Sequence, residues 1–320
     1  MCFLSSSLRF RLAGALALLF TFALAVSSLE FATARAQEDS SYVQKWEFGL
    51  EITATGDSSG IVASVPIPIN WPEQKVSIID ERKGGADRFT YKNLGDEAAQ
   101  LVISINKMDA GTNIRASVVM EIVKTDLAEH PHASALRLPT RSEVTSLNRY
   151  LKPSPYIEMN HRIVKAFGDS IDVDSTKPAY EQVRSIYESI RERIPYEFDE
   201  TIRTCMEAIE RGTGDCEELS SLFIAVCRQR GIPARAVWIP EHTYPEFYLV
   251  DEKGQGHWIP CQIAGSYEFG SMSEPKPILQ KGDNFKIPGN PARLRYVQPT
   301  LTARDATGSP ALRWIMQPLD

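Results

Sequence analysis

Hydrophobic and polar residues alternate along much of the first third of the chain. The runs Trp46–Ile52 and Ile114–Ile122 show the alternation without a break, and a period of two is typical of a β-strand with one buried face. Pro66 and Pro68 interrupt a third run, which predicts an edge strand there. Several short alternating strands in succession predict an antiparallel β-sandwich over residues 37–130.

The pattern changes after a connector, residues 131–153, that contains several prolines. Apolar residues then recur every three or four positions, which predicts helices. One helix is expected from Ser154, with Pro155 in its first turn, to Gly168. A second is expected around Val183–Ile194. These helices open a second, α+β domain over residues 154–320.

A further helix is predicted between Asp215, which can cap its start, and Gly231, which can end it. Its apolar face carries Leu219, Leu222, Phe223 and Val226. Three short strand patterns follow, over residues 234–239, 245–250 and 257–262. We therefore expect a buried helix packed on an antiparallel meander.

Cys216 lies at the predicted start of this helix. The helix dipole and the free backbone N–H groups of the first turn favour a thiolate there. Three acidic neighbours oppose that effect, because negative charge raises the pKa of a thiol: Asp215, Glu217 and Glu218. His242, at the mouth of the second strand, could withdraw the thiol proton and later donate it to a leaving amine. The two residues are thus candidates for a Cys–His pair.

Several short motifs follow one another in this region. They are Gly214-Asp215-Cys216, then Arg228–Arg235 with its Gly-Ile-Pro-Ala-Arg element, then His242, Tyr244, Glu246 and Tyr248, then Trp258 and Pro260. This order resembles the core of the transglutaminase-like superfamily, which shares the papain-like cysteine-peptidase fold. The resemblance implies that fold for the C-terminal domain.

The resemblance also implies roles for three residues. Cys216 would be the nucleophile and His242 the general base and acid. Gln262 stands where the family has an Asp, and would orient the imidazole. A neutral amide can accept a hydrogen bond from the ring but cannot stabilise the imidazolium by charge. Papain-like enzymes use Asn in this role, so an amide is compatible with activity.

The chain holds other histidines and cysteines besides these three. His257 is the rival base, and a surface position is the simpler interpretation. Four of the five cysteines lie beyond residue 36, and in an oxidising compartment they could form disulfides. One bridge involving Cys205 is an alternative to free thiols. Cys227 is expected to be a buried thiol on the Cys216 helix. A zinc site from Cys216, His242 and Cys261 fits no known ligand spacing, so no metal or other cofactor is expected.

Residues 1–36 have the features of a secretory signal peptide. Arg9 and Arg11 precede the apolar run Leu12–Val26, and Ala34-Arg35-Ala36 offers a cleavage site. The alternative is an uncleaved membrane anchor, but the apolar run of about fifteen residues is short for a spanning helix. We therefore expect an exported protein, periplasmic or extracellular, without a membrane span after cleavage.

Composition limits the class of partner. Of the 320 residues, 43% are hydrophobic and 24% charged, which is ordinary for a globular chain with a core. The formal net charge of −6 and the lack of a basic stripe argue against nucleic acid. The expected partner is a protein or peptide substrate, or a cell-envelope component.

The resemblance implies acyl transfer at an amide through a Cys216 thioester. With water as acceptor the protein would be a secreted cysteine protease or amidase, a hydrolase of peptide or isopeptide bonds, and this is the interpretation we favour. With an amine as acceptor it would be a protein cross-linking transglutaminase. A third possibility is a catalytically retired domain that binds a peptide or a cell-envelope polymer, with Gln262 as the sign of its retirement.

Overall fold

The computed structural model describes residues 41–319. The predicted signal peptide, residues 1–36, lies outside this range. Within residues 41–319, no helix is both long and apolar enough to cross a bilayer. The described chain is rich in β-strands and has four α-helices, with two short 3-10 helices, Ala133–Ala135 and Thr145–Leu151, in the connector.

The alternating pattern of the first third forms strands, as predicted. The strands are β1 (Ser41–Thr53), β2 (Ser58–Ile67), β3 (Gln74–Arg82), β4 (Arg88–Leu94), β5 (Ala98–Met108) and β6 (Asn113–Thr125). Their alternate apolar side chains fill one core. The pair of strands β1 and β6 and the pair β2 and β5 both contribute to it, and Phe48, Leu50, Leu101 and Val118 are fully buried. Period-two patterning therefore accounts for this part of the chain.

The edge position expected for β2 is wrong. Strand β2 pairs with β5 on one side and with β14 (Thr300–Thr302) and β15 (Asp305–Ala306) on the other. Pro66 is nevertheless tolerated, because β14 pairs only with Val62–Ser64 and leaves the proline end of β2 without a second neighbour. Pro66 therefore removes no hydrogen bond between β2 and β14.

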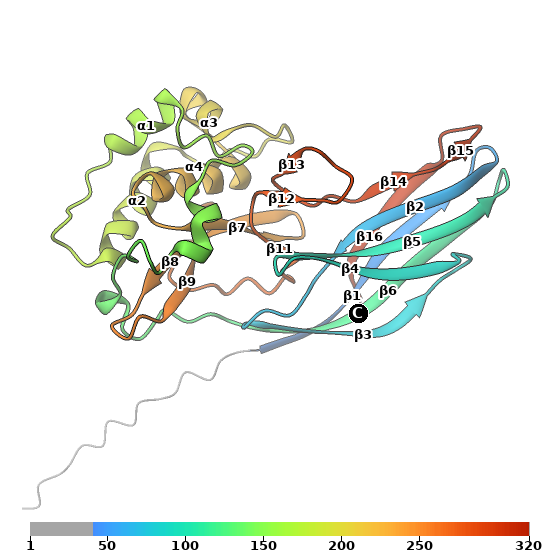
Figure 1. Ribbon diagram of the computed structural model, residues 1–320, viewed down its shortest axis with the longest axis horizontal. Helices are drawn as coiled ribbons and strands as arrows, with labels where there is room; N and C mark the ends of the chain where they lie inside the picture. The colour runs from blue at the N-terminus through green and yellow to red at the C-terminus, as the bar shows by residue number, and fades with distance from the viewer. Residues whose placement is uncertain (1–40, 320) are drawn as a thin grey trace, which may run out of the picture. The chain divides into compact units, whose positions relative to one another are not determined.

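Two larger sheets and a two-stranded one organise the strands (Figure 1). One sheet has the order β16-β1-β6-β3, in which β16 (Ala311–Leu319) runs antiparallel to β1 along nine residue pairs. The other sheet has the order β10-β9-β8-β7-β11-β5-β2-β14. In addition, β4 pairs with β5, and β15 pairs with β2. The sequence did not predict the pairing of residues 300–319 with strands near the N-terminus. The domain boundaries given above remain a prediction.

Four helices lie in the middle of the chain: α1 (Arg162–Asp169), α2 (Ala179–Arg193), α3 (Cys205–Arg211) and α4 (Cys216–Gln229). The second predicted helix is confirmed as α2. The first begins later than predicted, at Arg162 with His161 as its N-cap. Ser154 instead hydrogen-bonds Asp283, and Tyr156 has a φ of 68°, a left-handed conformation that a right-handed helix excludes.

The ends of α4 agree with the prediction. The Asp215 side chain accepts hydrogen bonds from the N–H groups of Glu217 and Glu218, and the Glu218 carboxylate accepts one from Asp215, which completes a capping box. Gly231, with a φ of 75°, ends the helix. The Ile232 and Gly231 N–H groups bond the carbonyls of Cys227 and Arg228, as in a Schellman motif.

Helix α4 packs on the predicted meander, β7 (Ala234–Ile239), β8 (His242–Val250) and β9 (Gly256–Gln262). Phe223, Val226, Phe247 and Ile259 lie in one buried cluster with side chains of α1 and α2. Short strands follow: β10 (Glu268–Phe269), β11 (Gln280–Lys281), β12 (Phe285–Lys286) and β13 (Arg293–Leu294). Strand β11 pairs with both β7 and β5, and so joins the meander to the first strands.

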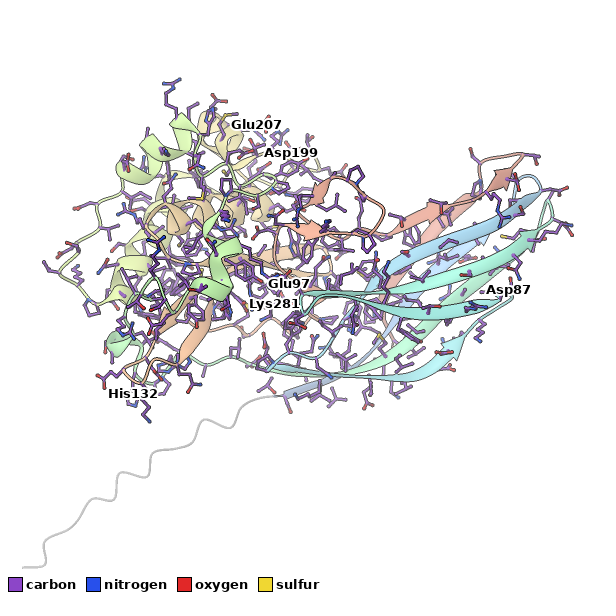
Figure 2. All side chains as sticks on the ribbon, in the orientation of Figure 1. Asp87, Glu97, His132, Asp199, Glu207 and Lys281 are labelled. Carbon is purple, nitrogen blue, oxygen red and sulfur yellow. The ribbon has the colours of Figure 1, made fainter. Side chains whose placement is uncertain are left out.

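Strand β11, which joins the meander to the first strands, carries a buried lysine. Lys281, labelled in Figure 2, donates from Nζ to Glu73 at 2.6 Å and to Glu246 at 2.5 Å. Its backbone N–H donates to the carbonyl of Glu97, also labelled. Arg235 holds the second oxygen of Glu246 at 2.8 Å. Burial raises the pKa of Glu246, but the charges of Lys281 and Arg235 outweigh it and keep that pKa below its usual range.

Candidate active site

Cys216 is the first residue of α4 and lines a cleft of about 780 Å³. His242, the first residue of β8, lines the same cleft. The backbone N–H of Thr243, the next residue along β8, donates a hydrogen bond to the Cys216 sulfur. The capping box of α4 and the β7–β8 hairpin therefore bring the two predicted residues to one place.

The thiol of Cys216 is harder to ionise than a free one. Burial raises its pKa to about 11, and the nearby charge of Asp215 adds to the increase. The hydrogen bond from Thr243 and the positive charge of Arg295 act in the opposite direction but do not cancel it. The expectation that an acidic neighbour opposes the helix dipole agrees with this balance, although burial is the larger cause. At neutral pH Cys216 is thus a thiol.

Gln262 reaches His242. Its side-chain oxygen Oε1 lies 2.8 Å from Nε2 of the imidazole, and its own side chain is buried at the end of β9. Because an amide oxygen only accepts hydrogen bonds, Nε2 carries the proton. The other ring nitrogen, Nδ1, is then the free base. The backbone oxygen of Gln262 accepts hydrogen bonds from Tyr187 and Arg191, which fix its position.

One rim of the cleft is apolar and exposed. Phe198 is 71% exposed, Ile202 54% and Tyr196 53%, and all three lie on the loop between α2 and α3. Large side chains of this kind seldom remain exposed together without a binding role. This rim therefore offers an apolar contact surface for a molecule bound near Cys216.

Two residues of the cleft have strained backbones. Tyr156 has a φ of 68° and Glu241 a φ of 62°, and both line the cleft. Glu241 occupies the tight turn between β7 and β8, directly before His242. Positive φ at a residue other than glycine costs of order 1 kcal/mol and gathers at functional sites. At Glu241 the strained turn sets the direction in which β8 begins.

The remaining predicted residues lie elsewhere. His257 does not line this cleft; it contacts His130 with ring centroids 4.7 Å apart, and its Nε2 lies 3.4 Å from Asp251. Cys205, Cys227 and Cys261 are buried free thiols, so the alternative of a bridge involving Cys205 is not what the structure has. Across residues 41–319 there is no group of three or more His, Cys, Asp or Glu residues arranged to hold a metal ion.

Trp238 and Arg295 also line the cleft, and the sequence did not predict either of them there. The indole Nε1 of Trp238 donates to the carbonyl of Gly282 at 2.7 Å, so this donor is already used by the protein. Arg295 lies beyond β13 and reaches the start of α4. A lone arginine in a loop carries no local pattern, so neither periodicity nor a motif could have placed it here.

A thiol at the start of a buried helix, with an amide-oriented imidazole on the adjacent strand, defines a cysteine-peptidase-like or transglutaminase-like class of site. The family comparison agrees. Residues 165–263 match the model of the transglutaminase-like superfamily, the family that the motifs predict. No curated protein matches the chain.

Solved structures show a similar fold. A putative cysteine protease from Cytophaga hutchinsonii is 14% identical, covers 88% of this chain and 93% of its own, and gives a TM-score of 0.56. A putative protease from Parabacteroides distasonis covers 70% of this chain and 47% of its own at 12% identity, with a TM-score of 0.25. The periplasmic domain of TgpA from Pseudomonas aeruginosa covers 69% and 90% at 10% identity, with a TM-score of 0.32. The Cytophaga hutchinsonii structure shares the fold of this chain.

Proposed function

We propose that the protein is a cysteine-dependent acyl-transfer enzyme that hydrolyses peptide or isopeptide bonds through a thioester on Cys216. The observation that supports this most directly is the 2.8 Å contact between His242 Nε2 and Gln262 Oε1 in the cleft that also holds Cys216. This contact leaves Nδ1 of His242 as the acceptor for the thiol proton. The catalytic roles of the three residues are part of the proposal.

The chemistry proceeds in two halves. Cys216 Sγ attacks the carbonyl carbon while its proton moves to His242 Nδ1. The imidazolium then gives that proton to the amine nitrogen as the C–N bond breaks, which leaves a thioester. His242 next takes a proton from water, which attacks the thioester and releases a carboxylic acid and the free thiol. The backbone N–H of Cys216 would contribute to the oxyanion hole.

The raised thiol pKa and the neutral Gln262 fit one another in this scheme. If a thiolate–imidazolium pair existed at rest, a carboxylate beside the ring would stabilise it, as in an Asp-containing triad. Here the thiol is protonated at rest, so charge separates only as the bond forms. A neutral amide then needs only to fix the ring and its tautomer, which the buried Gln262 side chain can do.

Acylation of Cys216 tests the proposal without a known substrate. The protein is mixed with p-nitrophenyl acetate, and release of nitrophenolate and the mass of the Cys216 peptide are followed. We expect an acetyl thioester on Cys216 that turns over, no adduct in Cys216→Ala, and acetylation slower by about 10²-fold in His242→Ala. His257→Ala is the matched control, because His257 lies on the adjacent strand outside the cleft. Equal rates in the two histidine variants would refute the role of His242.

Addition of a primary amine to the same reaction shows whether water or an amine is the preferred acyl acceptor. Capture of the acetyl group by glycine methyl ester in competition with water would favour a cross-linking transglutaminase. Unchanged release of acetate would favour a hydrolase.

A binding function without catalysis is the second candidate, and the raised pKa of Cys216 is the observation that favours it. The cleft with its exposed apolar rim would then hold a peptide or a cell-envelope polymer. Failure of Cys216 to form any acyl adduct, together with saturable binding of peptides, would support it.

The sequence supports three further parts of the proposal. The pattern of residues 1–36 favours an exported protein that acts in the periplasm or outside the cell. The strands of residues 37–130 favour a sandwich domain that acts as a scaffold for the transglutaminase-like domain. The chemistry above calls for no metal or other cofactor.

A further inference from the structure

The loop between α2 and α3, residues 194–204, carries the apolar rim of the cleft. Its side chains Tyr196, Phe198 and Ile202 are more than half exposed, and all three line the cleft that holds Cys216. Large apolar side chains are seldom left together in water, and a patch of them beside a cleft marks a binding surface. We therefore expect these side chains to be covered when the cleft is occupied.

Backbone hydrogen bonds tie the start of this loop to the residues before the nucleophile. The N–H of Glu197 donates to the carbonyl of Gly214 at 2.9 Å, and the N–H of Gly214 donates to the carbonyl of Pro195 at 3.3 Å. Tyr196 thus pairs in parallel with Gly214, two positions before Cys216. The position of the rim relative to the thiol is therefore set by backbone contacts.

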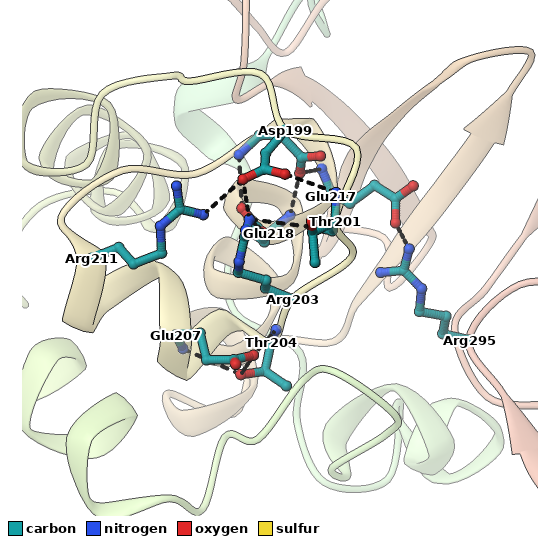
Figure 3. Close-up of polar contacts among 10 residues, drawn as sticks. Asp199, Thr201, Arg203, Thr204, Glu207, Arg211, Glu217, Glu218 and Arg295 are labelled. Atoms are coloured by element: carbon teal, nitrogen blue, oxygen red, sulfur yellow. Dashed lines mark hydrogen bonds and ion pairs between the residues drawn. The ribbon is translucent and has the colours of Figure 1, made fainter.

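Polar contacts hold the middle of the loop (Figure 3). The carboxylate of Asp199 accepts a hydrogen bond from the N–H of Thr201 at 2.8 Å. It also pairs with Arg203 at 2.6 Å and with Arg211, at the end of α3, at 3.4 Å. Arg203 in turn lies 3.8 Å from Glu218, whose carboxylate belongs to the capping box of α4. The loop is thus a preformed part of the cleft wall, so a ligand need not order it on binding.

The shape and charge of the cleft indicate what would cover the rim. A concave volume of about 780 Å³ suits a peptide segment better than the face of a folded protein. Tyr156 and Leu294 add further apolar surface to the cleft. The exposed residues Glu200 and Glu241 line it too, and their negative charge would repel an anionic membrane surface. An apolar side chain of a bound peptide fits these observations best.

We propose that Tyr196, Phe198 and Ile202 form a subsite for an aromatic or large aliphatic side chain of the substrate, next to the amide that Cys216 attacks. The substrate class is thus a peptide with an apolar residue beside the scissile bond. Phe198 is the most exposed of the three, so it has the most apolar area to bury and contributes most to the selectivity. The word substrate rests on the proposed function; the apolar subsite does not.

Two alkylating agents that differ by one apolar group test this subsite. N-benzyliodoacetamide carries a phenyl ring that iodoacetamide lacks, and both modify Cys216 without any turnover. The rate ratio of the first to the second is measured at Cys216 by mass spectrometry at pH ~9, where part of the thiol is ionised. This ratio is divided by the ratio for glutathione. An apolar subsite should raise the normalised ratio by about tenfold, because burial of a phenyl ring is favourable.

Three variants are compared with the natural chain. Phe198→Ser should lose most of the preference for the benzyl reagent, whereas Phe198→Leu should retain part of it. Val43→Ser is the matched control, since Val43 is also more than half exposed but lies on β1, away from the cleft, and should keep the natural ratio. A ratio at or below that of glutathione in the natural chain, or an equal fall in Val43→Ser, would overturn the proposal.

Protection of the natural chain makes the test independent of how the variants fold. Cys216 is alkylated with iodoacetamide in the presence of N-acetylphenylalanine amide or N-acetylleucine amide, and N-acetylserine amide is the polar reference. Saturable protection by either apolar compound, absent with the serine compound, supports the subsite and shows whether it prefers an aromatic or an aliphatic group. No difference among the three compounds overturns it.

Size-exclusion chromatography tests the other occupant of such a rim, a second copy of the chain. The proposal expects Phe198→Ser to elute with the natural chain. A dimer of the natural chain that Phe198→Ser converts to a monomer would mean that a second copy covers the rim, and would overturn the proposal. None of these outcomes depends on whether Cys216 forms a thioester, so the subsite and the proposed acylation can fail separately.

Discussion

The side-chain oxygen of Gln262 lies 2.8 Å from Nε2 of His242, although the residues are 20 positions apart and lie on different strands. Strand β9 brings the amide to the ring, and the hydrogen bonds of Tyr187 and Arg191 to the Gln262 carbonyl hold it there. The longer side chain of Gln, compared with Asn, therefore does not prevent it from orienting the imidazole.

Removal of this contact should slow acylation. In Gln262→Ala the imidazole loses its orienting partner, so we expect kcat/KM for p-nitrophenyl acetate to fall by about 10²-fold. Gln262→Glu keeps the length and adds a negative charge near the imidazolium, so its kcat/KM should equal or exceed that of the natural chain. Gln255→Ala, in the β8–β9 turn, is the control. A Gln262→Ala rate like that of the control would mean that the contact has no catalytic role.

The pH dependence of Cys216 alkylation follows from its raised pKa. Only the thiolate reacts, and with a pKa of about 11 the thiolate fraction grows with pH throughout the accessible range. The iodoacetamide rate at Cys216 should therefore rise about tenfold per pH unit from pH ~7 to ~10. Cys205, Cys227 and Cys261 are buried and provide slow internal references. A plateau at neutral pH would show a thiolate–imidazolium pair instead.

Loss of Lys281 should destabilise the fold strongly. Lys281→Met would leave the buried carboxylates of Glu73 and Glu246 without their shared cation. Breaking a buried ion pair from one side costs about 3–5 kcal/mol in the free energy of unfolding. Lys107→Met, which removes an exposed pair with Asp109, should leave the free energy of unfolding nearly unchanged. Denaturant unfolding of both variants checks this, and equal effects would contradict it.

Lys124 should make stability depend on pH. Burial lowers its pKa to about 8, while the charge of Glu274 opposes the shift only in part. The unfolded chain, with a lysine pKa near ~10.4, binds more protons between these values, so the penalty present below pH ~8 is relieved as pH rises. Relative to Lys124→Met, the natural chain should gain up to about 3 kcal/mol in unfolding free energy between pH ~7 and ~10.5. A difference that stays constant with pH would refute this.

The parts of the fold that the sequence predicts well depend on local signals. Asp215 and Gly231 mark the ends of α4 through capping and a left-handed φ, and both effects act within one helical turn. The meander and the placement of Cys216 and His242 follow from that helix. Helix α3 was missed although Thr204 and Glu207 form a capping box that the sequence displays.

The parts that the sequence did not predict depend on distant contacts. The start of α1 was misplaced because Tyr156 takes a left-handed φ within the cleft, where Arg295 stacks on its ring. The position of Arg295 beside Glu217 depends on the path of a loop after β13. The residues that flank Tyr156 and Arg295 in the sequence give no indication of these contacts.

The pairing of β16 with β1 also bears on how the protein is made. Strand β1 is among the first described segments to be synthesised, yet Phe48 pairs with Met316, at nearly the other end of the chain. A nascent chain leaving the ribosome can form the β1–β6 ladder early, but one side of β1 stays unpaired until β16 has been synthesised. Contacts so far apart in sequence slow folding and lengthen the exposure of strand edges to aggregation. Until β16 is available, we therefore expect β1 to be an exposed strand edge that is prone to aggregation.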